Sequence, residues 1–318
     1  MQRSLLAVAV ALVTTCSYAQ DFPARAISII VPNPPGGMNQ IHAQPLGAVL
    51  EKLYSQPAPV LNKPGGTAAA GTAFVANQSP DGYNVLVTTP NLYLAIEKDK
   101  VFGIQSPYSL AQIAPIALLS ADPLMMVVLG EAPVKSVAEL VAASKARPGE
   151  MSFSSSGPYG ITHVPLAMFL DAAGLKMRHV PTTGGGPALI QMLGGHVDTT
   201  AVGPAAVFPH VKSGKLRALA NTGVKRFPAM ADVPTLKELG FDVEAYLWVG
   251  LFTTAGVPEP TFNKLREVIR KTVADSAFQD AMAKAQIVPD YRDTPAFKEF
   301  FDADYKRLAA AVKKIGKI

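Results

Sequence analysis

Two glycine-rich turns are the parts of this sequence best suited to bind an anion. The first turn reads Pro34-Pro35-Gly36-Gly37 and follows an apolar run at 27–31 that is typical of a buried parallel strand. A helical pattern opens at about Asn39, so main-chain N–H groups and the positive end of a helix dipole would converge there. The turn carries neither of the common phosphate-binding glycine motifs. Taken alone, it fits a purely structural strand-to-helix connection equally well.

The second turn, Asn62-Lys63-Pro64-Gly65-Gly66, also ends a short strand and leads into a helix of small residues at 68–76. A further strand is expected at 84–88. This strand–helix alternation predicts a parallel sheet with helices on both faces and ligands at the carboxyl ends of the strands.

A second unit of the same kind follows in the middle of the chain. Its expected strands lie at 151–154, 176–180, 199–202 and 216–221, with helices at 162–173, 187–193 and 205–212. An apolar strand at 247–254 and three helices at 261–274, 276–284 and 295–314 complete the chain.

Two similar α/β units, the first completed by a returning C-terminal segment, predict a two-lobed protein with chain crossovers near 124–129 and 248–254. We expect one lobe to comprise residues 20–123 plus 248–318 and the other residues 124–247. A cleft between two such lobes is a usual place for a small ligand, and the crossovers would act as hinges.

The first 19 residues are typical of a secretory signal peptide, with Arg3 before an apolar core and Ser17-Tyr18-Ala19 as the cleavage pattern. The apolar core is too short for a permanent membrane anchor. Cys16, the only cysteine, falls inside this signal, so the mature chain would hold no disulfide and no thiol nucleophile. A lipid anchor at Cys16 is the alternative, which the bulk of Thr15 disfavours. The signal predicts a periplasmic location.

Charge and histidine spacing argue against two other classes of protein. The formal net charge is +5, and one less once Arg3 leaves with the signal, without a basic stripe interleaved with aromatics, so no nucleic-acid partner is expected. A mildly cationic surface favours anionic ligands. No metal site is predicted, because the five histidines form no HxxxH or HExxH pair: His42, His163, His179, His196 and His210.

The cluster Ser154-Ser155-Ser156-Gly157, with His163 downstream, raises the possibility of a serine hydrolase. The chain has no GxSxG nucleophile elbow, however, and serine-rich strand ends more often bind ligands or cap helices. We therefore predict no catalytic residue.

Several short motifs, in this order and spacing, resemble one family: the periplasmic solute-binding proteins of tripartite tricarboxylate transporters, often called Bug-type receptors. The resemblance covers essentially the whole mature chain. The motifs that carry it are Ile29-Ile-Val-Pro-x-Pro-Pro-Gly-Gly37, Asn62-Lys-Pro-Gly-Gly66, Pro80-Asp-Gly-Tyr83, Ser155-Ser-Gly157 with His163, His179-Val-Pro181 with Gly184-x-x-Pro-Ala-Leu189, Gly194-Gly195, Pro209-His210 with Ser213-Gly-Lys-Leu-Arg-Ala-Leu219, Asp232-Val-Pro-Thr235 and Trp248-x-Gly-Leu.

The resemblance implies an α/β type II periplasmic-binding fold without catalysis or cofactor, mainly carboxylate ligands, and a membrane permease as partner. It implies one ligand carboxylate held by the two glycine-rich turns, partly through ordered water. We expect a monomer. The residues expected to bind the ligand are Gly36, Gly37, Met38, Asn39, Gly65, Gly66, Thr67, Ala68 and Thr88 in the first lobe, and Ser155, Ser156, Gly157, Tyr159, His163, Thr182, Thr183, Gly184 and Val202 in the second.

The chain departs from the family pattern at four places. Gln40 and Val202 stand where the family commonly has Asp, Thr182-Thr183 replaces a frequent Tyr-Lys pair, and Tyr159-Gly160 replaces Gly-Thr. An Asp facing the cleft would suit an ammonium group, so its absence at 202 argues against amino-acid ligands. The more apolar and roomier wall favours an aromatic dicarboxylate, for example terephthalate. The alternatives are an aliphatic di- or tricarboxylate ligand, or a role as ligand-sensing partner of a signalling system.

Overall fold

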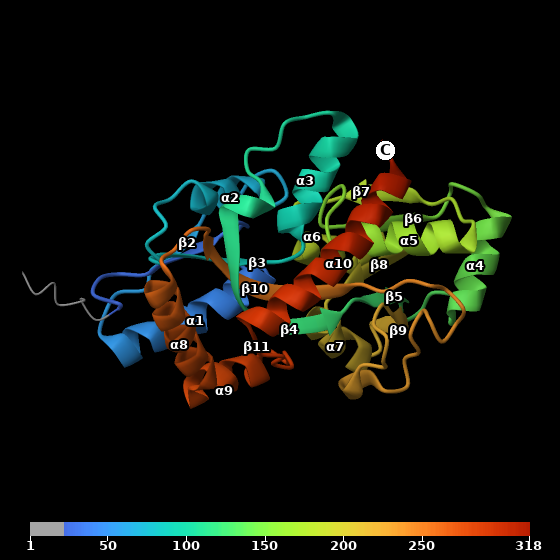
Figure 1. The fold of residues 1–318 in the computed structure, drawn as a ribbon. Coiled ribbons are helices and arrows are strands. Elements are labelled where there is room, and N and C mark those ends of the chain that lie inside the picture. Colours follow the sequence, from blue (N-terminus) through green and yellow to red (C-terminus); the bar gives the residue numbers. More distant parts are fainter. Residues whose placement is uncertain (1–21) are drawn as a thin grey trace, which may run out of the picture.

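Two β-sheets organise residues 22–318, the part of the chain that the computed structural model describes. The predicted signal peptide at 1–19 lies outside the described residues. The first sheet has six strands in the order β11-β4-β10-β3-β1-β2, and the second has five in the order β7-β6-β8-β5-β9. Helices cover both sheets (Figure 1). The predicted α/β class is confirmed.

The first sheet combines a parallel half with an antiparallel half. Strands β1, β2 and β3 pair in parallel, and β10 joins β3 and β4 antiparallel to both. Ile29, Ile30 and Val31 are fully buried, as expected for a continuous apolar run in a parallel sheet covered on both faces. The elements are β1 Ser28–Val31, α1 Met38–Tyr54, β2 Val60–Asn62, α2 Ala69–Ala76, β3 Asn84–Thr88, α3 Asn91–Phe102, η1 Leu110–Gln112, β4 Ile113–Pro123, β10 Tyr246–Thr254, α8 Glu259–Ala274, α9 Ser276–Lys284, β11 Arg292–Asp293 and α10 Thr294–Ile315.

The second sheet is built from the middle of the chain. Strands β6, β7 and β8 run in parallel, and β5 pairs antiparallel with β8 and β9. The carboxyl ends of β6, β7 and β8 therefore lie at one edge. The elements are β5 Met125–Leu129, α4 Val137–Ala146, β6 Ser152–Ser155, α5 Val164–Ala173, β7 Arg178–Pro181, α6 Gly185–Leu193, β8 Thr199–Val202, α7 Pro204–Lys212, β9 Leu216–Asn221 and η2 Pro228–Met230.

Helix α3 is the largest element that the sequence pattern did not predict. Leu92, Tyr93, Leu94 and Ala95 are all nearly inaccessible, so apolar residues face inward on more than one side of this helix. A helix buried in this way lacks the single apolar stripe that marks an amphipathic helix in a sequence.

The chain passes from the first sheet to the second at Leu124, between β4 and β5, inside the predicted crossover. It returns before Tyr246, because the whole of β10 pairs with strands of the first sheet. The second crossover thus precedes the predicted 248–254 segment. The division into lobes stays a prediction, and strand membership favours moving its second boundary to the start of β10.

Helix α10 connects the two halves. It starts against the first sheet, where Thr294 Oγ1 donates to Ile116 O at 2.6 Å. It ends against the second, where Lys314 Nζ lies 2.5 Å from Asp171 Oδ2 on α5 and Gly316 O accepts from Tyr159 OH at 2.6 Å. The helix crosses the molecule diagonally (Figure 1).

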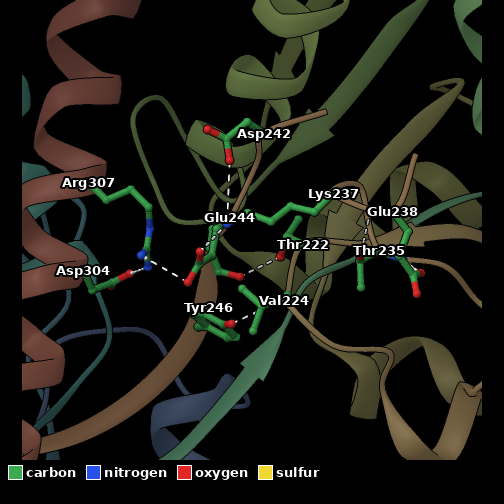
Figure 2. A network of polar contacts seen from close by, with 12 residues as sticks. Thr222, Val224, Thr235, Lys237, Glu238, Asp242, Glu244, Tyr246, Asp304 and Arg307 are labelled. Atoms are coloured by element: carbon green, nitrogen blue, oxygen red, sulfur yellow. Dashed lines mark hydrogen bonds and ion pairs between the residues drawn. The ribbon is translucent and has the colours of Figure 1, made fainter. Parts of the chain in front are cut away.

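A chain of polar contacts ties α10 to the segment between β9 and β10 (Figure 2). The buried Asp304 accepts from Trp248 Nε1 at 2.7 Å and from Tyr93 OH at 2.5 Å. Arg307 joins Asp304 to Glu244, whose Oε1 accepts at 3.2 Å. The lone tryptophan is therefore a packed and hydrogen-bonded residue of the first sheet, and it offers a fluorescent reporter beside the return crossover.

Asp122 is a buried carboxyl group on β4, two residues before the first crossover. Its side chain is 2% exposed, and Oδ2 has no hydrogen-bond partner within residues 22–318. Burial, with a smaller contribution from the negative Asp290, raises the pKa of Asp122 to about 7. The folded state therefore holds a proton that the unfolded chain releases near pH 4.

Replacing Asp122 with Asn should stabilise the protein at high pH. A raised pKa gives stability that is present below the unfolded value of 3.8 and is lost as pH rises through about 7. Urea unfolding at pH 8 should show the variant more stable by about 2 kcal/mol. The difference should shrink as pH falls toward 4. Asp302→Asn, which removes an exposed partner of Lys298, is the control and should change stability by less than about 0.5 kcal/mol. Equal stability of wild type and Asp122→Asn at every pH would contradict this assignment.

Candidate functional site

The first glycine-rich turn ends in a helix start with free donors. Gly37 is the N-cap of α1 and is extended, with no side-chain cap. Gln40 N and Ile41 N donate to Gly37 O at 3.0 and 3.2 Å. Within residues 22–318, the N–H groups of Met38 and Asn39 donate to no other group of the chain. Two donors at the positive end of a helix dipole suit an anion.

The second turn is held in an unusual backbone conformation. Gly66, Thr67 and Ala68 have φ values of 56°, 56° and 74°, in the left-handed region, and Gly65 has 147°. Thr67 is β-branched and Ala68 carries a Cβ, so both residues are strained by about 1 kcal/mol or more. None of these four N–H groups donates to another group of the described chain. Three successive left-handed residues point their N–H groups toward one side, which creates a concave donor surface.

The two turns lie side by side. Strands β1 and β2 are parallel neighbours, and Lys63 N donates to Val31 O at 2.8 Å just where both strands end. A Cβ on Gly71 of α2 would lie 2.7 Å from Pro32 Cα, so the helix after the second turn packs directly on the first. Glycine is required at position 71 for this approach.

Two buried polar atoms at this edge lack a partner within residues 22–318: Asn39 Oδ1 and Thr88 Oγ1. Thr88 ends β3, the strand beside β1, and is fully buried, while Asn39 is 2% exposed. An unsatisfied buried polar atom costs about 1–3 kcal/mol. Both atoms belong to residues that the sequence assigned to ligand binding, and a bound ligand or water would satisfy them.

The predicted site residues of the second sheet meet at the carboxyl edge of β6 and β7. Ser155 Oγ lies 2.7 Å from His179 Nε2 and also accepts from Gly157 N at 3.2 Å. Thr182 Oγ1 donates to Ser155 O or Gly184 O, both at 2.8 Å. Hydrogen bonds from β6 and from the end of β7 thus fix the turn that begins at Ser155.

A stacked pair of histidine rings packs against this turn. The rings of His163 and His179 lie 4.1 Å apart, and Phe153 stacks on both. His163 Nδ1 accepts from Tyr159 N at 3.1 Å. Burial lowers the pKa of His163 to about 3, with a contribution from His179, and burial lowers the pKa of His179 to about 4. Both rings are therefore neutral at neutral pH.

The serine cluster pairs with a different histidine from the one that the sequence suggested. The histidine bonded to Ser155 is His179, and not the His163 that the sequence suggested. Ser155 is fully buried, and its hydroxyl lies within 3.1 Å of Gly157 O. This serine braces the turn. His163 packs beneath the turn, so its predicted contact with a ligand stays a prediction.

Tyr159 has its ring buried inside the protein. Its ring is 1% exposed and packs edge-on against Phe102 and His163. Its hydroxyl donates to Gly316 O at 2.6 Å and accepts from Ile318 N at 3.1 Å. The ring is therefore engaged with the C-terminal end of the chain, and the φ of Tyr159 is 57°. A ligand contact by Tyr159 stays a prediction.

The ends of the two sheets approach each other at two points. A Cβ on Gly203 would lie 3.0 Å from Leu247 Cδ2 and 3.8 Å from Met38 Cε, so the first residue of α1 reaches the start of α7. Asn91 Oδ1 accepts from Ile161 N at 2.9 Å. Val202, the residue before Gly203, is buried at the end of β8 in the apolar core that also holds Met125 and Val207, so its contact with a ligand stays a prediction.

The predicted binding segment at Thr182, Thr183 and Gly184 borders open space. Thr183 is exposed, Gly184 is the extended N-cap of α6, and a Cβ on Gly185 or Gly186 would meet nothing within 4 Å. This space agrees with the roomier wall expected from the sequence.

The sequence missed Asn91, Thr162 and Asn62, which brace the turns. Thr162 Oγ1 accepts from Ser156 N at 2.6 Å, and Asn91 bonds the loop before α5. The sequence feature that could have predicted this role for Asn91 is its position directly after the strand end Thr88-Thr89-Pro90. Thr162 stood inside the predicted helix, which in the structure begins two residues later.

A cavity of about 400 Å³ lies elsewhere, at the far end of α1. It is lined by Leu53, Tyr54, Arg270, Lys271, Ala274 and Asp275. Helix α1 has 17 residues, which separates this cavity from the glycine-rich turns by roughly 25 Å. The unpaired N–H groups and buried polar atoms place the candidate site at the turns, and the predicted interlobe cleft stays a prediction.

In residues 22–318, no three His, Cys, Asp or Glu side chains gather to hold a metal. Over the same range, no helix is both long and apolar enough for a membrane span.

Residues 43–317 match the family model described as the tripartite tricarboxylate transporter family receptor. The chain is 30% identical over 300 residues to protein BugT of Bordetella pertussis, covering 94% of this chain and 91% of BugT. A TctC solute-binding protein from Polaromonas, solved without ligand, is 31% identical with a TM-score of 0.74, covering 92% of this chain and 99% of that one. The predicted resemblance and fold are confirmed.

Two solved proteins of Rhodopseudomonas palustris share the fold at lower identity. One was solved with adipate, at 23% identity and a TM-score of 0.82, covering 93% of this chain and 99% of that one. The other was solved with malate, at 22% identity and a TM-score of 0.80, covering 92% and 100%.

The stacked histidines should make the protein sensitive to acid. In the unfolded chain, both imidazoles take up protons below pH 6.5. In the folded chain, His179 stays neutral down to about pH 4 and His163 down to about pH 3, because burial lowers their pKa values. Stability should therefore fall as pH drops from 6.5 toward 4, by up to about 1.4 kcal/mol per pH unit for a fully buried ring and less for the half-buried His179.

His179→Gln should flatten this loss, because an amide can bond Ser155 without titrating. Thermal unfolding between pH 7 and pH 4 measures the effect. His210→Gln, on α7 outside the pair, is the control and should keep the slope of wild type. An unchanged slope in His179→Gln would show that the pair does not set the acid sensitivity.

Proposed function

Because the chain belongs to the tripartite tricarboxylate transporter family of receptors, we propose that it is a periplasmic solute-binding protein that captures a small carboxylate and delivers it to a membrane permease. The observation that carries the proposal is the pair of adjacent turns whose N–H groups have no partner in the described chain, with the strained run at 66–68. The proposed role is binding without catalysis, and the fully buried Ser155 supports it.

A carboxylate suits these turns for electrostatic reasons. Met38 N and Asn39 N lie at the start of a 17-residue helix, and the N–H groups of 66–68 face one side of the second turn. Each carboxylate oxygen can accept two such donors, directly or through ordered water. Hydrogen bonds to a charged group contribute about 1.5–3 kcal/mol each, so a few of them offset the desolvation of the anion.

The surroundings favour a dicarboxylate with an apolar centre. Met38 and Leu247 lie beside Gly203, and neither carries a charge. The second sheet adds the hydroxyl of Ser156 as a donor for a second carboxylate, because it accepts from Thr162 Oγ1 at 2.7 Å and keeps its own hydrogen. An aromatic dicarboxylate such as terephthalate matches this distribution, because its ring faces gain from apolar contact. The adipate and malate proteins share the fold, so an aliphatic dicarboxylate is the second candidate.

Ligand binding would favour the arrangement in which the two sheets touch. The contacts Asn91–Ile161 and Met38–Gly203 exist only when their ends are close. A ligand that bonds turns on both sheets binds that state better than an open one, and this difference in affinity is what shifts the population. The permease would recognise the closed surface.

Calorimetric titration of the purified protein should rank the ligands. We expect terephthalate to bind at least about tenfold more tightly than adipate, malate or citrate, a difference of about 1.4 kcal/mol from ring contacts. Terephthalamide, which keeps the ring and lacks both charges, is the matched control and should not bind measurably. Micromolar binding of malate or citrate without terephthalate binding would overturn the aromatic assignment. Absence of binding by every carboxylate would overturn the proposed function.

Met38→Pro tests whether the turn binds through its N–H groups. Proline fits the first position of a helix, and Gly37 is already extended as a residue before proline should be, so the fold is preserved while one N–H is lost. Carboxylate affinity should fall by roughly tenfold to a hundredfold. Met38→Ala keeps the N–H and removes the side chain, and it is the control for apolar contact. Equal affinity of the proline and alanine variants would contradict the N–H clamp.

A further inference from the structure

Four carboxamide side chains connect the two glycine-rich turns, and we call them the carboxamide belt: Asn33, Asn39, Gln40 and Asn62. Asn62 Nδ2 donates to Asn33 O and to Gln40 Oε1, both at 2.9 Å. Asn39 Nδ2 donates to Asn33 Oδ1 at 2.6 Å. Asn62 is the last residue of β2, while the other three belong to the first turn and the start of α1. The belt therefore spans the space between the turns.

The orientation of the amides follows from one main-chain group. Asn33 O is a carbonyl and can only accept, so the side chain of Asn62 must turn its NH₂ toward it. The second hydrogen of that NH₂ then needs an acceptor, and this requires Gln40 to present its oxygen. Both hydrogens of Asn62 are used on the first turn.

The same orientation leaves Gln40 Nε2 as a donor. Gln40 is half-buried, and its NH₂ has no hydrogen-bond partner within residues 22–318. The belt contains no ionised group, so the N–H groups of the turns act on an anion without a nearby negative charge that opposes them. A carboxylate at position 40 would keep the bond to Asn62 and place a negative charge one residue from Asn39 N.

We propose that Gln40 and Asn62 are positioning residues that hold the two turns at a fixed separation, and that the neutrality of the belt strengthens the binding of a carboxylate by the turns. The proposal rests on the proposed function for its second half only. Two bonds from one NH₂ restrain the turns beyond the last rung of the sheet, Lys63 N to Val31 O. A neutral belt selects anions that bring no ammonium group of their own.

Hydrogen exchange on the ligand-free protein tests the positioning role. The variants are Asn62→Ala, which removes both bonds, and Gln40→Glu, which keeps an acceptor for Asn62. Asn62→Ala should speed exchange of the N–H groups of Lys63, Gln40 and Ile41 by about tenfold, because these protected amides flank the belt. Gln40→Glu should leave them within about twofold of wild type. Unchanged exchange in Asn62→Ala would overturn the positioning role.

Calorimetry with terephthalate and adipate tests the electrostatic role. Gln40→Glu should weaken both ligands by about tenfold in 20 mM salt, and by less in 500 mM salt because screening reduces repulsion from the new charge. Asn62→Ala should weaken them by a factor that salt does not change. In the double variant Gln40→Ala/Asn62→Ala, the loss should equal that of Asn62→Ala alone, since both substitutions break the same bond. A salt-independent loss in Gln40→Glu would overturn the electrostatic role.

Gln78→Ala is the matched control. Gln78 Nε2 donates to Phe74 O at 3.0 Å at the end of α2, so the substitution removes a comparable amide bond in the same half of the protein and away from the turns. Neither exchange at the turns nor affinity should change. If wild type binds neither probe, the proposed function and the electrostatic role both fail, and the exchange experiment alone decides the positioning role. If Asn62→Ala leaves hydrogen exchange at the turns unchanged while Gln40→Glu lowers the affinity for the probes, the positioning role is overturned and the electrostatic role stands.

Discussion

The candidate site depends on one constraint: main-chain N–H groups must stay unpaired and yet hold fixed positions. A free N–H group at the end of a strand normally finds water or a neighbouring carbonyl. Here the first turn keeps two such groups at the head of a 17-residue helix, and the second keeps a left-handed run through Thr67 and Ala68. Strain of that kind persists only where the surroundings enforce it. The packing of Gly71 on Pro32 and the belt from Asn62 to Gln40 are the enforcing contacts.

The second sheet differs, because the main-chain N–H groups of Ser156, Gly157 and Tyr159 are bonded to side chains. Its turn is fixed by Ser155, which contacts His179, and by the ring stack of His163 and His179 on Phe153. Buried neutral imidazoles can accept a hydrogen bond without bringing charge to an anion site. The same burial makes them an acid-sensitive part of the fold, because a proton on either ring would be placed in a poorly solvated position. Rigidity near the ligand and stability at low pH are therefore linked through one pair of side chains.

The two sheets are also connected away from the turns. Strands β4 and β10 pair along most of their length and lead into and out of the second sheet. Helix α10 spans the molecule (Figure 1). Gly316, the residue after it, accepts from Tyr159 OH. Through Asp304 and Arg307 the helix also contacts Glu244 in the return segment (Figure 2). Any movement of one sheet relative to the other must therefore bend the crossovers and shift the contacts of α10.

The sequence by itself determined the elements whose pattern is local. The strands 84–88, 199–202 and 216–221 were predicted with the bounds they have, and both glycine-rich turns were found, because apolar runs ending in Gly and Pro mark strand ends without reference to the rest of the chain. Tertiary structure alone decided which side chains meet across those ends. It paired Ser155 with His179 instead of His163, turned Tyr159 toward the C-terminal end, and used Gln40 to bridge to Asn62. It also formed α3, whose burial on several sides erases the helical stripe. These outcomes depend on distances between residues far apart in the chain, which the spacing along a sequence does not contain.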